Sequence, residues 1–157
     1  MKSRTLTVAM LLAWIGAAAA AGGFTALDRA SAARLVDPAG HAAPTIVALW
    51  SQDCVHCKTN LELFADLARA EARLRLVTVA VEPVEGADAA PLERLAVPGA
   101  RFAYGAEAPE ALAYALDAKW RGELPRTLLF DGRGGKVALS GVVSEADARR
   151  ALGLGAP

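Results

Sequence analysis

The feature that most constrains this chain is a pair of cysteines, Cys54 and Cys57, where an apolar run meets a helical pattern. They are its only two cysteines, and thiols at this spacing on a helix start lie close enough to close a small disulfide ring. Cys54 would sit at the positive end of the helix dipole, where a thiolate is stabilised, so we expect it to be the reactive sulfur. Cys57, one turn further in, would act as the resolving thiol.

The sequence around the cysteines predicts a strand, a helix and a second strand. Residues 45–50 form a continuous apolar, β-branched run, typical of a central strand covered on both faces. From Cys54 to about Arg73, apolar residues recur at spacings of three and four, which predicts an amphipathic helix. The run from Leu74 to Val81 predicts the second strand, and this order implies a parallel crossover. The predicted fold class is therefore α/β.

Caps, turns and periodicity predict the remaining elements. A short helix or irregular arm is expected over 27–36, with Asp28 or Ser31 as its cap. Ser144 to Asp147 has the form of a capping box. The other predicted elements are a short helix from 88 to 96, a strand at 101–104, a helix from 109 to about 119, strands at 126–130 and 136–140 joined by a glycine-rich hairpin turn, and a closing helix to 152.

Residues 1–23 have the character of a targeting segment, with a basic start, an apolar run and then small residues. The alanines at 19–21 fit a signal-peptidase site, while residues 6–24 are roughly long enough to span a bilayer. A cleaved signal peptide and an uncleaved membrane anchor both stay open. We expect residues 24–43 to form an N-terminal arm and residues 44–157 to form one domain outside the cytoplasm, where disulfides persist.

Composition narrows the function. The 157 residues suffice for one domain with its own core, and 17 basic against 17 acidic residues leave no net charge to attract nucleic acid. A disulfide across two intervening residues removes little entropy from the unfolded chain, so it would be a poor structural staple. A redox-active disulfide is the better explanation of the pair.

A second set of residues completes a known pattern. Gly122, Pro125, Thr127 and Asp131 are spaced as Gly-x-x-Pro-x-Thr-x-x-x-Asp, and Trp50 stands four residues before Cys54. With the cysteine pair, these residues make the stretch from Thr45 onward resemble the exported TlpA-like thiol-disulfide oxidoreductases of the thioredoxin superfamily. The resemblance implies a thioredoxin-like fold, with a central mixed sheet and helices on both faces.

The resemblance also implies a substrate platform at Pro125, in a cis peptide bond beside Cys54. A cis bond there presents the backbone of Leu124 outward, ready to pair with an extended substrate segment. Trp120 is a candidate for lining the same groove. Trp50 is a further candidate, although it also suits packing beneath the active-site loop.

The chain departs from the family pattern at three positions. Asp53 places a negative charge next to the reactive thiol, where many relatives have Trp. Ala48 stands where thioredoxins keep a buried acid, and Asn60 where TlpA-like reductases often carry one. Glu62 and Asp66 are weak substitutes, since helix residues of this kind are usually solvated. The usual internal proton acceptors are therefore missing.

His56, between the cysteines, is expected to tune the site by favouring the Cys54 thiolate, which makes the disulfide more oxidising. Asp53 opposes this effect, so the sequence leaves the potential open. Lys58 and Arg126 flank the site and could attract acidic substrates, but solvated surface charge is the simpler interpretation. His41 is assigned no role.

The sequence thus predicts a periplasmic enzyme that reduces disulfides in exported proteins, supplied with electrons by a membrane partner. We expect no cofactor, no metal and no nucleic-acid partner. A DsbA-like oxidase is the first alternative. A copper chaperone that uses Cys54, Cys57 and a histidine is the second, although His56 is poorly placed to join both sulfurs on one ion.

Overall fold

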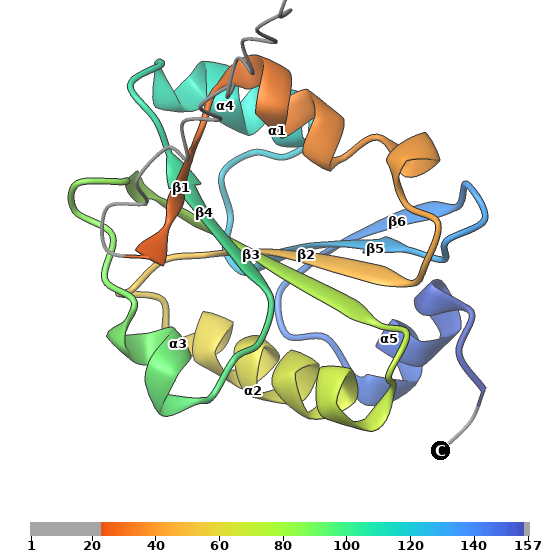
Figure 1. Cartoon of the computed structure of the whole chain (residues 1–157). Helices are drawn as coiled ribbons and strands as arrows, with labels where there is room; N and C mark the ends of the chain where they lie inside the picture. The colour runs from red at the N-terminus through yellow and green to blue at the C-terminus, as the bar shows by residue number, and fades with distance from the viewer. Residues whose placement is uncertain (1–22, 156–157) are drawn as a thin grey trace, which may run out of the picture.

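The computed structural model describes residues 23–155 (Figure 1). The targeting segment predicted for residues 1–23 therefore lies, apart from Gly23, outside the described residues. Over the described range, no helix has both the length and the apolar character needed to cross a bilayer. The strands are β1 (Thr25–Leu27), β2 (Thr45–Trp50), β3 (Arg75–Pro83), β4 (Ala100–Tyr104), β5 (Arg126–Phe130) and β6 (Lys136–Ser140). The helices are α1 (Arg29–Leu35), the short 3-10 helix η2 (Pro38–Gly40), α2 (Val55–Ala70), α3 (Ala90–Arg94), α4 (Pro109–Leu116) and α5 (Glu145–Leu152).

The strands form a six-stranded mixed sheet in the order β1-β4-β3-β2-β5-β6. The first four strands of that order run parallel, and β5 and β6 run antiparallel to their neighbours. Both the α/β class and the mixed sheet are confirmed. The parallel β2–β3 crossover and the β5–β6 hairpin were also predicted correctly.

Helices cover both faces of the sheet, as predicted (Figure 1). Side chains alternate along β2: Ile46, Ala48 and Trp50 join the core beneath α2, α3 and α5, whereas Val47 and Leu49 join the core beneath α1 and α4. Because both faces are packed, every residue of β2 is buried, which explains its continuous apolar run. Cys54 follows four residues after the end of this buried central strand, which therefore positions the cysteines.

The N-terminal segment is built into the sheet, which the sequence analysis did not predict. β1 pairs with β4 in parallel at the edge of the sheet, and Gly105 N–H donates to the Leu27 carbonyl at 2.9 Å. Asp28 then caps α1, in a complete capping box with Ser31. Three residues are too few to reveal a strand by alternation, so the segment resembled an arm.

Most predicted element boundaries agree with the structure, and the starts of α2 and α5 are set by capping residues. The strands at 45–50, 126–130 and 136–140 match the prediction to the residue. The helix predicted from Cys54 begins at Val55, because Cys54 is its N-cap. Ser144 caps α5 by accepting from Asp147 N–H, but the Asp147 carboxylate accepts from the Ser144 hydroxyl instead of the backbone, so the capping box is incomplete.

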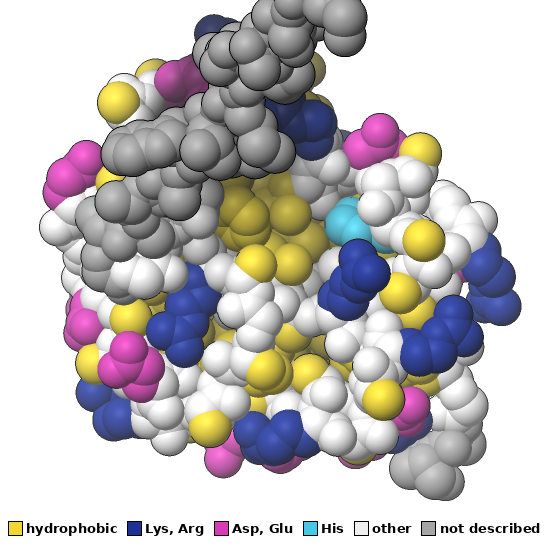
Figure 2. All heavy atoms as spheres, viewed as in Figure 1, with side chains coloured by type: hydrophobic (Ala, Val, Ile, Leu, Met, Phe, Trp, Pro, Cys, Tyr) yellow, Lys and Arg dark blue, Asp and Glu magenta, His cyan; other side chains and the backbone are white. Residues whose placement is uncertain are grey.

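Charged side chains of both signs are interspersed around a hydrophobic centre on the face shown in Figure 2. Some ion pairs join distant segments. Arg149, almost fully buried on α5, pairs with Glu71 at the end of α2 at 3.0 Å and with Glu145 at 2.9 Å. The Arg149–Glu71 pair fixes α5 to the C-terminal end of α2, away from the cysteines.

Candidate active site

The cysteines lie at one edge of the sheet, where four strand ends meet. β2 and β3 are parallel and end there, as Trp50 pairs with Ala80. β5 runs the other way and begins there, since Leu49 pairs with Arg126. β6 ends beside β5, with Ser140 opposite Arg126. The residues that follow β2, precede β5 and follow β6 are therefore neighbours in space.

Cys54 and Cys57 form a disulfide across the first turn of α2. The Cys54 Sγ accepts a hydrogen bond from Cys57 N–H at 3.1 Å, so the sulfur takes the place of a capping side chain. Cys54 is half-buried, whereas Cys57 is only 1% exposed. One sulfur is accessible and stabilised by a helix N-terminus, and the other is held beneath it.

The loop that delivers Cys54 is held by Glu82, a residue that the sequence analysis did not select. Gln52 N–H donates to Glu82 Oε1 at 3.0 Å, and Cys54 N–H donates to the Ser51 carbonyl at 3.1 Å. Glu82 lies at the end of β3, next to the end of β2. Its position after a strand predicted to neighbour β2 was the signal that could have identified it.

Pro125 immediately precedes β5, at the edge of the sheet where β2 ends. The Leu124–Pro125 peptide bond is cis, and Pro125 is buried. The Pro125 carbonyl accepts from Gly141 N–H at 2.9 Å, across the β5–β6 hairpin. Leu124 is half-buried and packs against the cores on both faces of the sheet.

The two tryptophans considered for the substrate groove differ in their burial. Trp50 is 1% exposed and lies in the core with Cys57, which fits packing beneath the active-site loop and leaves little of its side chain for a substrate to contact. Its burial follows from the α2-facing side of a central strand. Trp120 is half-buried against the opposite core and donates its Nε1–H to the Glu123 carbonyl at 2.6 Å.

Asn60 occupies the position where an acid was missing, and it is fully engaged. It is 2% exposed. Its Nδ2 donates to the Gly141 carbonyl at 3.0 Å and its Oδ1 accepts from Val143 N–H at 2.9 Å. Asn60 is therefore a link between α2 and the loop after β6, and not only the absence of an acid.

Ala48, the other position without an acid, lies between two threonines on the α2-facing side of the sheet. It pairs with Thr78 on β3 and with Thr127 on β5. Both threonines are 0% exposed, and their hydroxyls have no hydrogen-bond partner among the described residues. The two strand neighbours of Ala48 thus carry hydroxyl groups and not carboxylates.

Arg126 is not a solvated surface charge. Its side chain is 12% exposed and pairs with Asp117, itself 10% exposed, with Nε 3.1 Å from Oδ2. Burial raises the pKa of Asp117, but hydrogen bonds from Arg126 and from Lys119 N–H outweigh it, so the pKa lies below its ordinary value. The pair ties the end of α4 to β5 and so spans the segment that leads to Pro125.

The remaining candidates lie on the surface. Asp53, His56 and Lys58 are exposed around the first turn of α2. Glu62 and Asp66 are exposed further along the helix, and Asp66 pairs with Arg69, so neither lies in the buried layer with Cys57. Across residues 23–155, no three His, Cys, Asp or Glu side chains gather into a metal-binding group.

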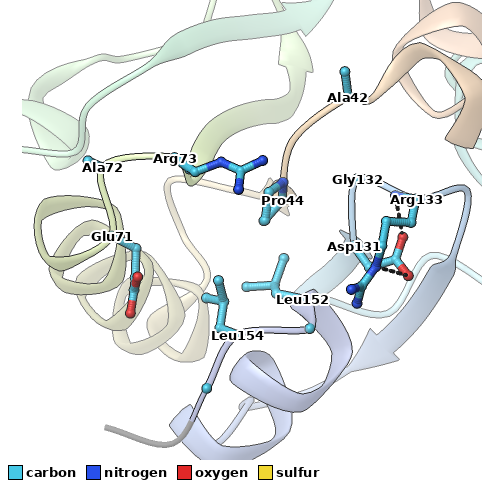
Figure 3. Close-up of a pocket in the computed structure, with 12 residues that line it drawn as sticks. Ala42, Pro44, Glu71, Ala72, Arg73, Asp131, Gly132, Arg133, Leu152 and Leu154 are labelled. Atoms are coloured by element: carbon cyan, nitrogen blue, oxygen red, sulfur yellow. Dashed lines mark hydrogen bonds and ion pairs between the residues drawn. The ribbon is translucent and has the colours of Figure 1, made fainter.

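A pocket of about 390 Å³ lies at the other end of the sheet, next to Pro44 at the start of β2 (Figure 3). Arg73 and Arg133 line it above an apolar floor that includes Leu152. Its two carboxylates are already partnered. Glu71 pairs with Arg149, and Asp131 accepts backbone hydrogen bonds within its own turn. This pocket is separate from the cysteines.

Comparison with solved structures identifies the architecture. A secreted disulfide oxidoreductase of Mycobacterium tuberculosis, homologous to Escherichia coli DsbE, matches with a TM-score of 0.54 at 14% identity, over 73% of this chain and 84% of that one. A thioredoxin-related protein from Neisseria meningitidis serogroup B matches with a TM-score of 0.55 at 20% identity, over 71% and 84%. StoA from Bacillus subtilis matches with a TM-score of 0.51 at 14% identity, over 71% and 83%.

No protein-family model matches the sequence, and no curated protein matches it either. The structural likeness, at these identities, concerns the fold. The chain has the thioredoxin fold that the sequence resemblance implied, and it carries the Cys54–Cys57 disulfide on the first turn of α2.

Proposed function

We propose that this chain is a TlpA-like thiol-disulfide oxidoreductase that reduces disulfides in exported proteins through Cys54 and Cys57. One observation carries the proposal: the partly buried Cys54 caps the helix with its sulfur, and that sulfur is bonded to the buried Cys57 one turn deeper. The thioredoxin fold supports it, because solved proteins with this fold are described as a disulfide oxidoreductase, a thiol:disulfide interchange protein and a thiol-disulfide oxidoreductase.

The exchange needs only these two sulfurs and a disulfide client. In the reduced protein, the Cys54 thiolate attacks one client sulfur, forms a mixed disulfide and releases the other client sulfur as a thiolate, which takes a proton. Cys57 then loses its proton and attacks the Cys54 sulfur. The second client thiolate leaves, and the Cys54–Cys57 disulfide closes. The client gains two electrons and two protons. The enzyme supplies both electrons and the Cys57 proton, and the second proton comes from solvent, which took it up when Cys54 ionised.

The place of action and the partners are part of the proposal. The N-terminal targeting pattern supports export to the periplasm, whether as a soluble protein or with an anchor. The description of the M. tuberculosis protein as secreted points the same way. Because each turnover leaves the enzyme oxidised in an oxidising compartment, we propose a membrane partner that returns two electrons to the disulfide.

An oxidase that works in the opposite direction is the second candidate. It is favoured by the exposed His56 in the first turn of α2. A group that stabilises the thiolate stabilises the reduced protein, which makes the disulfide a stronger oxidant.

The reduction potential separates the two directions. It is measured by equilibrating the purified protein with glutathione redox buffers and quantifying the disulfide-bonded fraction. A value near the thioredoxin end of the known range, about −270 mV, supports the reductase. A value near the DsbA end, about −120 mV, supports the oxidase and overturns the proposed direction.

Cysteine variants test the chemistry itself. Cys57→Ser should accumulate covalent mixed disulfides with a disulfide-containing protein substrate, because no resolving thiol is left to release it. Cys54→Ser should abolish turnover and trap nothing. If Cys57→Ser also traps nothing and copper or zinc copurifies with the wild-type protein, metal binding is the better account of the cysteines.

A further inference from the structure

The side chain of Asn60 joins two parts of the candidate active site that are far apart in sequence. It projects from α2, one turn after Cys57, and both residues are almost completely buried. Its carboxamide spans two backbone groups of the loop after β6, donating to the Gly141 carbonyl at 3.0 Å and accepting from Val143 N–H at 2.9 Å. Both ends of the amide are used, so its orientation is determined by its partners.

Gly141 extends this link to Pro125. Its N–H donates to the Pro125 carbonyl at 2.9 Å, while its own carbonyl accepts from Asn60. Gly141 has a φ of +84°, a backbone conformation that residues other than glycine rarely adopt. There is space for a side chain, since a Cβ there would meet no atom within 4 Å. Two hydrogen bonds through one residue therefore connect α2, which carries the cysteines, to the backbone at Pro125.

We infer that Asn60 is a positioning residue, which holds the Leu124–Pro125 backbone at a set place relative to Cys54. The inference rests on the proposed function. An extended client that pairs with the backbone at Leu124 must also bring its disulfide to the Cys54 sulfur. Exchange is fast only if both contacts are met at once, so the separation between α2 and the Pro125 segment sets the rate for such a client.

The hydrogen-bond pattern requires an amide at this position. A carboxylate of the same shape could still accept from Val143 N–H, but its second oxygen would face the Gly141 carbonyl, placing one acceptor against another. Asn60→Asp therefore removes one hydrogen bond of the link with almost no change in size, and Asn60→Ala removes both. The two substitutions form a graded series.

The test compares two oxidants of different size with the reduced wild-type protein and the variants. One is the small aromatic disulfide DTNB, which reaches Cys54 without needing the Leu124 backbone. The other is an extended peptide that carries a single mixed disulfide with glutathione. We expect the rate with DTNB to stay within about twofold in Asn60→Asp and Asn60→Ala. We expect the second-order rate constant for the peptide to fall about tenfold or more in both variants.

The matched control is Arg149→Met. Arg149 fixes the lower end of α5 to Glu71 and touches neither the loop after β6 nor Pro125, so this variant loses stability without losing the link. The rate ratio is the rate constant with the peptide divided by the rate constant with DTNB. Arg149→Met should preserve the wild-type value of this ratio. Measurements are made well below the unfolding midpoint of each variant. If an Asn60 variant does not fold, Gly141→Ala disturbs the same link from the other side and should lower the same ratio.

Three results overturn the inference while leaving the proposed function intact. The first is an unchanged rate ratio in the Asn60 variants, and the second is an equal fall of the ratio in Arg149→Met. The third is a wild-type protein that reacts with DTNB but never with the peptide, because no extended client is then recognised. Failure of the wild-type protein to exchange with either disulfide overturns the proposed function itself.

Discussion

The backbone N–H of Cys57 donates to the Sγ of Cys54 at 3.1 Å, so the sulfur itself caps the helix that follows it. Upon reduction, this N–H and the helix dipole would face a thiolate instead of a neutral sulfur, which stabilises the reduced protein. His56 lies between the two cysteines with its side chain exposed, where a positive charge would add to the same effect.

We therefore expect His56→Pro to make the reduction potential more negative by about 10–30 mV, which corresponds to about 0.5–1.4 kcal/mol for an exposed charge. Proline is tolerated in the first turn of a helix, so the fold should persist. The potential is measured against glutathione. Lys58→Gln serves as the control, because it removes an exposed charge that lies outside the segment closed by the Cys54–Cys57 disulfide. An unchanged or less negative potential in His56→Pro rules out this tuning role.

The Asp117–Arg126 pair predicts a stability that depends on acid pH. The pKa of Asp117 is lower in the folded chain than its ordinary value, so the folded state binds fewer protons and its stability is lost as pH falls below about 4. Asp117→Asn should be about 1–3 kcal/mol less stable than wild type at pH 7, since Arg126 loses its charged partner on α4 and keeps Ser140 and Glu123. This gap should narrow between about pH 5 and pH 3.

Urea unfolding at pH 7, 5 and 3 measures that gap. Glu85→Gln is the control, because Glu85 is exposed and has no ion pair among the described residues. A gap between wild type and Asp117→Asn that is the same at pH 3 as at pH 7 would contradict the proposed role of the carboxylate.

The buried hydroxyl of Tyr104 should make the stability of the fold decrease at alkaline pH. Burial raises the pKa of its hydroxyl to about 12, and that hydroxyl has no partner among the described residues. The folded state thus keeps a proton that the unfolded chain releases near pH 10, so stability falls as pH rises from about 10 to about 12. Tyr104→Phe should weaken this fall and raise stability at pH 7 by about 1 kcal/mol. Tyr114→Phe, at an exposed ring, should change neither value.

Gly105 tests the packing of the edge strand. A Cβ at this position would lie 2.4 Å from the Leu27 carbonyl oxygen, so Gly105→Ala must push β1 away from β4. We expect a loss of about 1–3 kcal/mol and faster amide exchange at Gly105, whose N–H now binds Leu27. Gly86→Ala is the control, because its Cβ would lie 3.7 Å from the nearest atom. Equal exchange rates in both variants would contradict this account of the edge.

The elements with strong local signals were predicted correctly. The apolar run before Cys54, the capping residues Asp28 and Ser144 and the glycine-rich hairpin turn each act within a few residues, so they are visible in a sequence. The cysteine pair was equally local. Because the pair follows an apolar run and opens a helical pattern, one sulfur was expected at the helix start and the other one turn deeper.

The parts that were missed depend on partners distant in sequence. Asn60 looked like a missing acid because its partners, Gly141 and Val143, lie more than eighty residues further along the chain. Arg126 looked like a surface charge because burial depends on how α4 ends against β5. Such placements come from the tertiary register, which no local pattern encodes.

The pairing of β1 with β4 also sets an order of assembly. β2, α2 and β3 are consecutive in the chain and can form together early, whereas Thr25 must wait for Phe102 before it has a strand to join. During synthesis the first strand is thus made long before its partner and stays unpaired until β4 has been added. As a three-residue strand at the edge, it should also be the first part of the sheet to open.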